Sequence, residues 1–478
     1  MRPLFAFLCL AVGLTAQDPG LVLRTFVGYN QMAASLPLTA EQKTEVQKLG
    51  RSAMLAAAQG KQGEALKLLH RGTALMRATE WTPSLSLASA LQPAVDHALW
   101  TPGQVVKVTF KRLYEPEPGA PASVKGSMSV RPLQTGAAVE LGALSAEAAE
   151  FKVPELAKGA YRLEIRFQGL SQPKVVDVAV APGVLERGRA LQKRLANVKA
   201  PDGAALTSAR YLAGLPERAD RSEASPSVQF DRDLATAEEI VRGLEAGKDT
   251  LKDRTGDTHR AYLSKVDDTL QPYRLYVPAK YDSARPTPLV MALHGMGGDE
   301  NTLFDRYGSR ALQDSAEKHG WIVAAPKGRE SASMYRGSAE QDVLDVMAEV
   351  RRDYNIDAGR IYMTGHSMGA YGTWSIAQNH PTLFAALGPV SGGGSPALME
   401  KIRHIPQYVV HGDNDKTVPV TSSRSMVEAG KKAGSSIEYV EIAGGGHNEV
   451  FMPAIPGIFD FFAKHSKKAA AAAGSGGQ

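Results

Sequence analysis

The sequence predicts an α/β domain with a mostly parallel sheet over residues 258–466, preceded by smaller helical and β-rich segments. In residues 258–466, short apolar runs alternate with amphipathic segments of helical length. The run Leu289–Leu293 is apolar throughout, as expected for a strand that is buried on both faces. Residues 88–182 instead alternate apolar and polar positions with period two, which indicates antiparallel strands.

Elements of the α/β domain can be placed in order along the chain. The expected strands cover residues 273–277, 289–293, 321–325, 360–364, 385–390, 407–411 and 437–442. The expected helices cover residues 339–354, 368–379 and 455–464. Ligands of such sheets bind beyond the carboxyl ends of the strands, so polar residues at those ends are the candidates for a site.

The rest of the chain divides by its pattern. Residues 17–87 read as a helical hairpin, with its break at Gly60–Gly63, and residues 183–257 as a helical connector. Residues 88–182 are similar to a small immunoglobulin-like β-sandwich. Residues 467–478 (KKAAAAAGSGGQ) are low in complexity and are expected to be a disordered tail.

Composition excludes several classes of protein. Hydrophobic residues make up 43% of the 478 residues and charged residues 22%, which is ordinary for a globular chain and excludes a wholly disordered one. The 55 basic residues exceed the 50 acidic ones by only five, too thin an excess to indicate a nucleic-acid groove.

Residues 1–16 have the pattern of a signal peptide. Arg2 precedes the apolar run Leu4–Leu14, and Ala16 offers a small residue at the cleavage point. We therefore expect a secreted or periplasmic protein. The single cysteine, Cys9, lies inside this run, so no disulfide and no thiol nucleophile are expected in the mature chain. No later stretch is long enough to predict a membrane span.

The motif Gly365-His366-Ser367-Met368-Gly369 carries the strongest chemical signal. It follows an expected strand and precedes a helix of small residues. That context favours a sharp turn that presents the serine above the sheet as a nucleophile.

A serine nucleophile needs a base, and the base needs an orienting carboxylate. His447 is the candidate base because it lies in a glycine-rich loop after a strand. Asp415 is the candidate acid, with Asp413 as a helper or turn cap. A metal site of His411, Asp413 and Asp415 is the alternative for this segment, and it would leave the serine motif unexplained.

Backbone donors should stabilise the negative oxygen that forms during attack. One is expected to be the N–H of Met368, next after the serine. The other is expected in His294–Gly298, with Met296 as first choice and Gly295 as the alternative. This chemistry needs no metal and no organic cofactor.

Substrate contacts are harder to predict. Tyr335 is a candidate to stack on an aromatic or sugar group, Arg336 to bind a carboxylate, and His366 to line the site beside the serine. Only about thirteen residues separate Val390 from His404, which leaves no room there for a large lid and favours bulky or polymer-attached substrates.

Four segments carry a resemblance to secreted α/β-hydrolase esterases: HGMGGD (294–299), DAGRIYMTGHSMGAYGTW (357–374), HGDNDKTVPV (411–420) and GGGH (444–447). The sequence resembles the feruloyl and acetylxylan esterase-like group, the polyhydroxybutyrate depolymerase-like group and peptidases with a prolyl-oligopeptidase-like domain. The resemblance covers about residues 258–466 and implies a triad of Ser367, Asp415 and His447. Met296 stands where several relatives carry cysteine, which separates this chain from those branches.

The sequence thus predicts a secreted serine carboxylesterase acting on an ester substrate, with acyl or feruloyl groups on polysaccharides as the favoured class. A prolyl-oligopeptidase-like serine peptidase is the alternative enzyme. The rival from another class is a non-catalytic binding protein that works through residues 17–257. The sequence leaves the oligomeric state undetermined.

Overall fold

The computed structural model describes residues 19–144, 148–226 and 229–467. The predicted leader (residues 1–16) lies outside the described residues, as does the predicted tail apart from Lys467. The chain forms two compact units. The first comprises the residues up to 92, 110–125 and 167–172, and the second comprises 93–109, 126–166 and everything from 173 onward. Among the described residues, no helix has the length and apolar character needed to cross a bilayer.

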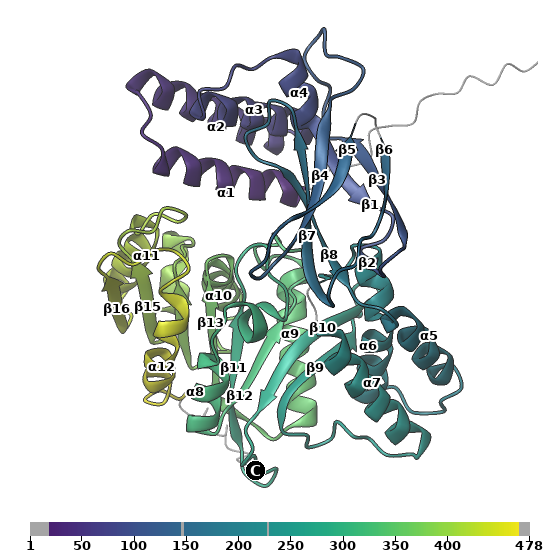
Figure 1. Ribbon diagram of the computed structural model, residues 1–478. Coiled ribbons are helices and arrows are strands. Elements are labelled where there is room, and N and C mark those ends of the chain that lie inside the picture. The colour runs from purple at the N-terminus through teal and green to yellow at the C-terminus, as the bar shows by residue number, and fades with distance from the viewer. Residues whose placement is uncertain (1–18, 145–147, 227–228, 468–478) are drawn as a thin grey trace, which may run out of the picture. The chain divides into compact units, whose positions relative to one another are not determined.

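The first unit is built on helices (Figure 1). They are α1 (Pro19–Ser35), α2 (Ala40–Ala58), α3 (Gln62–Met76) and α4 (Pro83–Ala90). Helix α2 begins with a capping box, in which Thr39 and Gln42 satisfy each other's backbone N–H groups. The Tyr29 hydroxyl of α1 donates to the Val46 carbonyl at 2.7 Å. Its ring lies where a side chain at Gly72 would be, so a glycine on α3 allows α1 to approach closely.

Eight strands follow: β1 (Leu91–Val95), β2 (Leu99–Trp100), β3 (Val105–Arg112), β4 (Gly126–Pro132), β5 (Val139–Leu144), β6 (Ala148–Lys152), β7 (Gly159–Phe167) and β8 (Lys174–Val180). They form a three-stranded sheet of order β1-β3-β6 and a five-stranded sheet of order β2-β8-β7-β4-β5. The period-two pattern predicted strands here, and strands are present.

The connector contains three helices, α5 (Val184–Leu195), α6 (Ala204–Asp220) and α7 (Phe230–Glu245). Helix α6 is buried along most of its length. The α6 hydroxyl of Thr207 donates to the Ala261 carbonyl of the next strand at 2.7 Å. The connector is therefore fastened directly to the α/β sheet.

The large sheet of the second unit has eight strands in the order β16-β15-β14-β13-β11-β12-β10-β9. They are β9 (Gly256–Leu263), β10 (Leu270–Val277), β11 (Thr287–Leu293), β12 (Ile322–Pro326), β13 (Ile356–His366), β14 (Ala386–Val390), β15 (Gln407–Gly412) and β16 (Ile437–Ile442). Strands β9, β10 and β12 pair antiparallel, and the remaining pairs are parallel. This confirms the predicted fold class, an α/β-hydrolase sheet flanked by helices.

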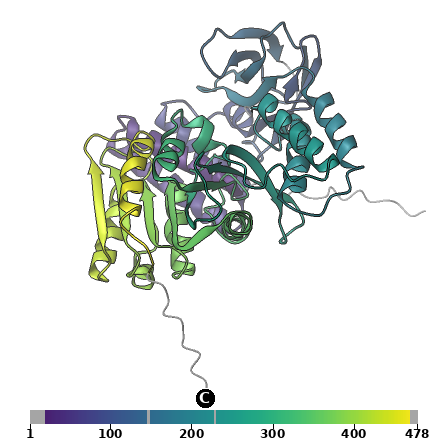
Figure 2. The ribbon, with the colours of Figure 1, turned by 90° about the horizontal axis from the view of Figure 1, so that it is seen from below.

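Helices cover both faces of this sheet (Figures 1 and 2). One face holds α9 (Ser338–Asp353), α10 (Met368–Asn379) and α11 (Thr421–Lys432). The other holds α8 (Ala311–His319) and α12 (Phe451–Phe462). Strand β11 shows why its sequence is continuously apolar, because Leu289 and Met291 join the first core and Val290 and Ala292 join the second. Two short helical turns, Thr302–Arg306 and Pro396–Ile402, complete the unit.

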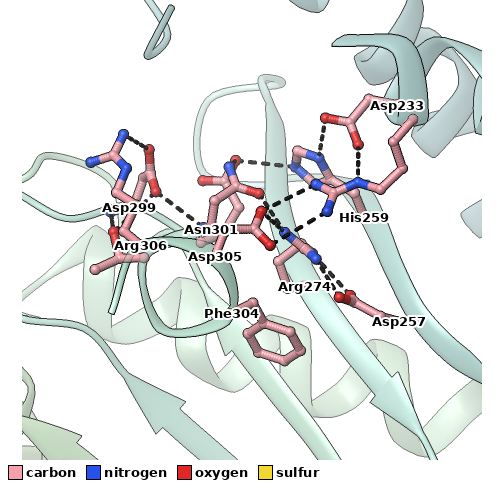
Figure 3. A network of polar contacts seen from close by, with 12 residues as sticks. Asp233, Asp257, His259, Arg274, Asp299, Asn301, Phe304, Asp305 and Arg306 are labelled. Carbon is pink, nitrogen blue, oxygen red and sulfur yellow. Dashed lines mark hydrogen bonds and ion pairs between the residues drawn. The ribbon is translucent and has the colours of Figure 1, made fainter. Parts of the chain in front are cut away.

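A buried ion cluster fastens the connector to the sheet (Figure 3). His259 of β9 has a side chain only 2% exposed and lies between two carboxylates, with Asp233 of α7 at 3.3 Å and Glu300 at 3.1 Å. Burial alone would lower the pKa of His259, but the two carboxylates outweigh it and raise that pKa to about 9. Glu300 lies in the loop after β11, so the cluster also holds that loop.

The raised pKa of His259 predicts an alkaline loss of stability. Its ordinary pKa is about 6.5, so the stabilisation is fully present below that pH and is lost as the pH rises through about 9. The difference in unfolding free energy between wild type and His259→Gln should shrink by roughly 3 kcal/mol between pH 6.5 and 10. Denaturant unfolding followed by tryptophan fluorescence measures it. The exposed His404→Gln serves as control, and a His259→Gln difference that stays constant with pH would contradict the prediction.

Candidate functional site

Ser367 lies at the tight turn between β13 and α10. Its backbone has φ 54° and ψ −115°, a strained conformation for a residue other than glycine. The Ser367 N–H donates to the Val390 carbonyl at 2.9 Å, which holds the turn against β14. A Cβ at Gly369 would lie 2.2 Å from the Leu293 carbonyl oxygen, so only glycine lets α10 approach β11 this closely. The turn raises the serine at the carboxyl edge of the sheet.

Two side chains from other strand ends meet this serine. His447, in the loop after β16, has its Nε2 2.8 Å from the Ser367 Oγ. Its Nδ1 lies 2.6 Å from Oδ2 of Asp415, which follows β15. The structure therefore brings the three predicted residues into one hydrogen-bonded row, although 80 residues separate the serine from the histidine.

Asp415 is held by more than the histidine. Its Oδ1 accepts the backbone N–H groups of Thr417 at 2.8 Å and Val418 at 2.9 Å. A second imidazole, His411, places Nε2 3.1 Å from Oδ2. Burial favours the neutral acid, but the hydrogen bonds from His411 and His447 outweigh it and lower the pKa of Asp415 far below its usual value. Asp415 is therefore a carboxylate fixed in one orientation.

The neighbouring candidates take supporting positions. Asp413 accepts the Gly444 N–H at 2.7 Å and so ties the β15 loop to the loop that carries His447. Among the residues that the structure describes, no group of three or more histidine, cysteine, aspartate or glutamate side chains is arranged to hold a metal ion. The metal alternative for His411, Asp413 and Asp415 therefore has no support in this geometry.

The loop after β11 lies beside the serine. A Cβ at Gly295 would lie 3.5 Å from the Ser367 Cβ. Beneath the loop, the buried ring of His294 contacts two carbonyl oxygens at 2.8 Å each, those of Gly295 and Lys327. Met368, the next residue after the serine, begins α10, and the N-terminus of a helix favours negative charge.

A chain of hydrogen bonds runs from Tyr307 to the loop of the histidine. Tyr307 lies next to the loop after β11, since a Cβ at Gly295 would lie 3.2 Å from the Tyr307 hydroxyl oxygen. That hydroxyl lies 2.7 Å from Nδ1 of His366, whose Nε2 lies 2.9 Å from the His447 carbonyl. Burial lowers the pKa of His366 to about 3, so its ring is neutral and has one proton to donate. A carbonyl only accepts, so Nε2 carries that proton and the Tyr307 O–H donates to Nδ1.

The predicted oxyanion donors stay predictions. Met296, the first choice, and Gly295, the alternative, lie in the loop beside the serine, and Met368 begins α10. Sequence reasoning missed Tyr307, because nothing in its local pattern distinguishes it.

Two of the predicted substrate contacts need correction. Tyr335 is 0% exposed, and its hydroxyl accepts the His294 N–H at 3.0 Å. Its ring occupies the space next to Gly328 and Gly372, so no face is open for stacking on a substrate. His366 is 1% exposed and is used in the chain described above. Arg336 is exposed, in the turn before α9.

A pocket of about 560 Å³ is lined by the loop whose Gly295 adjoins Ser367, and we call it the serine-side pocket. It lies between the loop after β11 and the segment that follows His447. Its lining residues are Gly295, Met296, Gly297, Gly298, Thr302, Arg306, Tyr307, Asn448, Glu449 and Met452. Sequence analysis did not name Asn448, Glu449 or Met452, although their position directly after the candidate base was a signal that could have indicated them.

Comparison with known proteins shows what the α/β region is similar to. Residues 270–433 match the family model described as "Putative esterase". The chain is 31% identical over 144 residues to the bifunctional acetylxylan esterase/xylanase XynS20E of Neocallimastix patriciarum. That match covers 30% of this chain and 21% of the relative. It is 28% identical over 161 residues to probable feruloyl esterase C of Aspergillus terreus, covering 32% of this chain and 58% of the relative.

Among solved structures, a ferulic acid esterase of Anaeromyces mucronatus is 17% identical, with a TM-score of 0.37 and coverage of 43% of this chain and 90% of that one. The chain spans less than two thirds of the length of the two curated relatives. The resemblance to esterases that the sequence motifs indicated is confirmed for the region that carries Ser367 and Asp415.

The hydrogen-bond chain predicts a positioning role for Tyr307. Tyr307→Phe leaves the His366 Nδ1 without its donor, so the ring that bonds to the His447 carbonyl loses a fixed contact. Unpaired buried groups cost about 1–3 kcal/mol, so we expect Ser367 to react with a fluorophosphonate probe roughly 10-fold more slowly.

Tyr362→Phe is a matched control, because it also removes one tyrosine hydroxyl. That hydroxyl donates to the His465 backbone carbonyl at 2.7 Å. It should cost stability but leave the labelling rate near wild type. Equal rates in the two variants would contradict the positioning role of Tyr307.

Proposed function

We propose, from this relationship to esterases, that the protein is a secreted serine carboxylesterase that cleaves esters through a Ser367–His447–Asp415 triad and an acyl-enzyme. The observation that carries the proposal is the row of contacts at 2.8 Å and 2.6 Å that joins the three side chains. Export rests on the leader pattern of residues 1–16.

Each residue of the row has a defined role in the reaction. His447 Nε2 accepts the Ser367 hydroxyl proton as Oγ attacks the ester carbonyl, and it then gives that proton to the departing alcohol. Water, deprotonated by the same nitrogen, attacks the acyl-enzyme and releases the acid and the free serine. Asp415 holds Nδ1–H of His447 and stabilises the imidazolium that forms in each step.

Backbone N–H groups stabilise the negative oxygen of the tetrahedral intermediate. Met368 and Met296 are the proposed donors, one from each side of the serine. Tyr307 and His366 position the loop of His447 without contacting the ester. No metal or organic cofactor enters the reaction.

Acylated polysaccharides are the proposed substrate class. Two curated relatives carry acetylxylan esterase and feruloyl esterase in their names. The serine-side pocket mixes Met296 and Met452 with the polar Thr302, Asn448 and Glu449, which suits a small or aromatic acyl group that bears oxygen atoms.

Replacement of the nucleophile tests the activity itself. Ser367→Ala should reduce ester turnover by roughly 10⁵-fold or more, because the covalent route is lost. Turnover is measured with p-nitrophenyl acetate, methyl ferulate, acetylated xylan and an aminoacyl p-nitroanilide. Ser375→Ala, on the same helix, is the control and should retain activity. Turnover confined to the anilide would favour the peptidase alternative, and partner binding without any turnover would favour the non-catalytic one.

Replacement of the acid tests the orientation of the base. In Asp415→Asn an amide N–H can donate to Nδ1 and force the proton onto Nε2, so His447 no longer accepts the serine proton. We expect kcat to fall roughly 10³- to 10⁴-fold with little change in KM. Asp413→Asn makes the same chemical change two residues away and should stay within about 5-fold of wild type. If both variants lost activity equally, Asp415 would not be the orienting acid.

A further inference from the structure

His411 of β15 lies against the carboxylate of Asp415 and has no role in the reaction steps proposed above. Both side chains are 0% exposed. The Nε2 of His411 lies 3.1 Å from Oδ2 of Asp415, the same oxygen that Nδ1 of His447 contacts at 2.6 Å. The same Nε2 lies 3.0 Å from the Val418 carbonyl oxygen. A carboxylate and a carbonyl only accept hydrogen bonds, so both contacts require a proton on Nε2 of His411.

The other nitrogen of this ring contacts a serine whose own proton has another acceptor. Nδ1 of His411 lies 2.6 Å from Oγ of Ser423, on α11. The Ser423 hydroxyl donates to the Gly392 carbonyl at 2.9 Å. Gly392 is buried, and a buried carbonyl that lacks a donor is costly, so the hydroxyl proton is needed there. Oγ then accepts from the ring, and this contact requires a proton on Nδ1.

The burial of Asp415 is a second reason for a positive charge beside it. Burying an ionised carboxylate is costly unless a charge of opposite sign is paired with it. His447 cannot supply that charge before the reaction starts, because its Nε2 has to be bare to accept the Ser367 proton. His411 is the other imidazole on the same oxygen, so a proton on each of its nitrogens would make the buried pair neutral.

The charged groups of the neighbouring elements have other partners. His366 of β13 is neutral, as its hydrogen bonds to a hydroxyl and a carbonyl require. Glu441, the strand neighbour of His411 on β16, accepts from Arg424 of α11 at 2.9 Å. Asp413, in the loop after β15, is exposed and is an anion. None of these groups provides a cation at the acid of the triad, which leaves the imidazole of His411.

The contacts of His411 also lead back to the turn of the nucleophile. A Cβ at Gly392 would lie 2.4 Å from the Ala370 Cβ and 3.1 Å from the Ser367 carbonyl oxygen, so the loop after β14 packs directly on that turn. His411 and Ser423 therefore connect the acid of the triad to the backbone that holds the serine.

We infer that His411 is a buried imidazolium that positions Asp415 and lowers the affinity of His447 for a proton. The inference rests on the proposed function and deepens it, because it states how the base is kept ready. The anionic Asp415 favours a proton on His447, and a cation on the same oxygen opposes it. Nε2 of His447 thereby stays free to accept the Ser367 proton. His411 acts only through Asp415 and is a positioning residue.

Removal of the charge is tested with His411→Gln, whose side-chain amide can still donate to Asp415. The rate at which a fluorophosphonate labels Ser367 is measured from about pH 5 to 9. Without the neighbouring cation His447 holds a proton more readily, so the midpoint of the acid limb should move up by roughly 1 pH unit. His404→Gln removes an exposed histidine and should leave the midpoint unchanged.

The midpoint separates the proposed role from a merely structural one. Loss of a packing contact lowers the plateau rate but leaves the midpoint where it is. A wild-type midpoint in His411→Gln, with or without a lower plateau, would therefore overturn the inference.

The charge is also read directly from the ¹⁵N chemical shifts of the histidine rings in the full-length protein. At about pH 7 both ring nitrogens of His411 should have the shifts of protonated nitrogens. Their signals are assigned by their loss in His411→Gln or, if that variant does not fold, by the change that Ser423→Ala causes at Nδ1. One protonated and one bare nitrogen would overturn the inference. This measurement needs no ester and no labelling, so its result is distinct from a failure of the proposed activity.

Discussion

The close approach of α10 to the end of β11 is the constraint on which the site depends. Gly369 lies so near the Leu293 carbonyl that no side chain fits between them. This approach forces the strained turn at Ser367 and sets the serine directly beside the loop that begins at His294. A larger residue at this position would separate Ser367 from the loop after β11, whatever the sequence of the loop. The packing of α10 against β11 therefore also sets the position of Ser367.

Electrostatics around the serine follow from which groups are buried and what they contact. Asp415 is buried yet ionised, because two imidazoles and two backbone N–H groups face its oxygens. His366 is equally buried but neutral, because its partners are a hydroxyl and a carbonyl. Two buried groups in one site therefore differ in charge: the aspartate is an anion and the histidine is neutral. In each case the hydrogen-bond partners suit that state.

The connector is part of the α/β unit rather than a passive spacer. Thr207 bonds to the β9 backbone, and Asp233 pairs with the buried His259. The same histidine contacts Glu300, only a few residues beyond the loop at the serine. Displacing the connector would therefore expose a charged cluster and release that loop. The buried cluster ties the two segments together, and Ser225 of the connector contacts Arg306, which lines the serine-side pocket.

The sequence by itself determined the α/β sheet, because continuous apolar runs such as Leu289–Leu293 are required wherever helices cover both faces of a strand. It also determined Ser367, His447 and Asp415 as candidates, since each follows a strand end and carries a local signature of glycine, serine or acid. Tertiary structure alone decided the roles of Tyr307, Tyr335 and His366. Their contacts come from segments tens of residues away in the sequence, and a local sequence pattern cannot predict such partners.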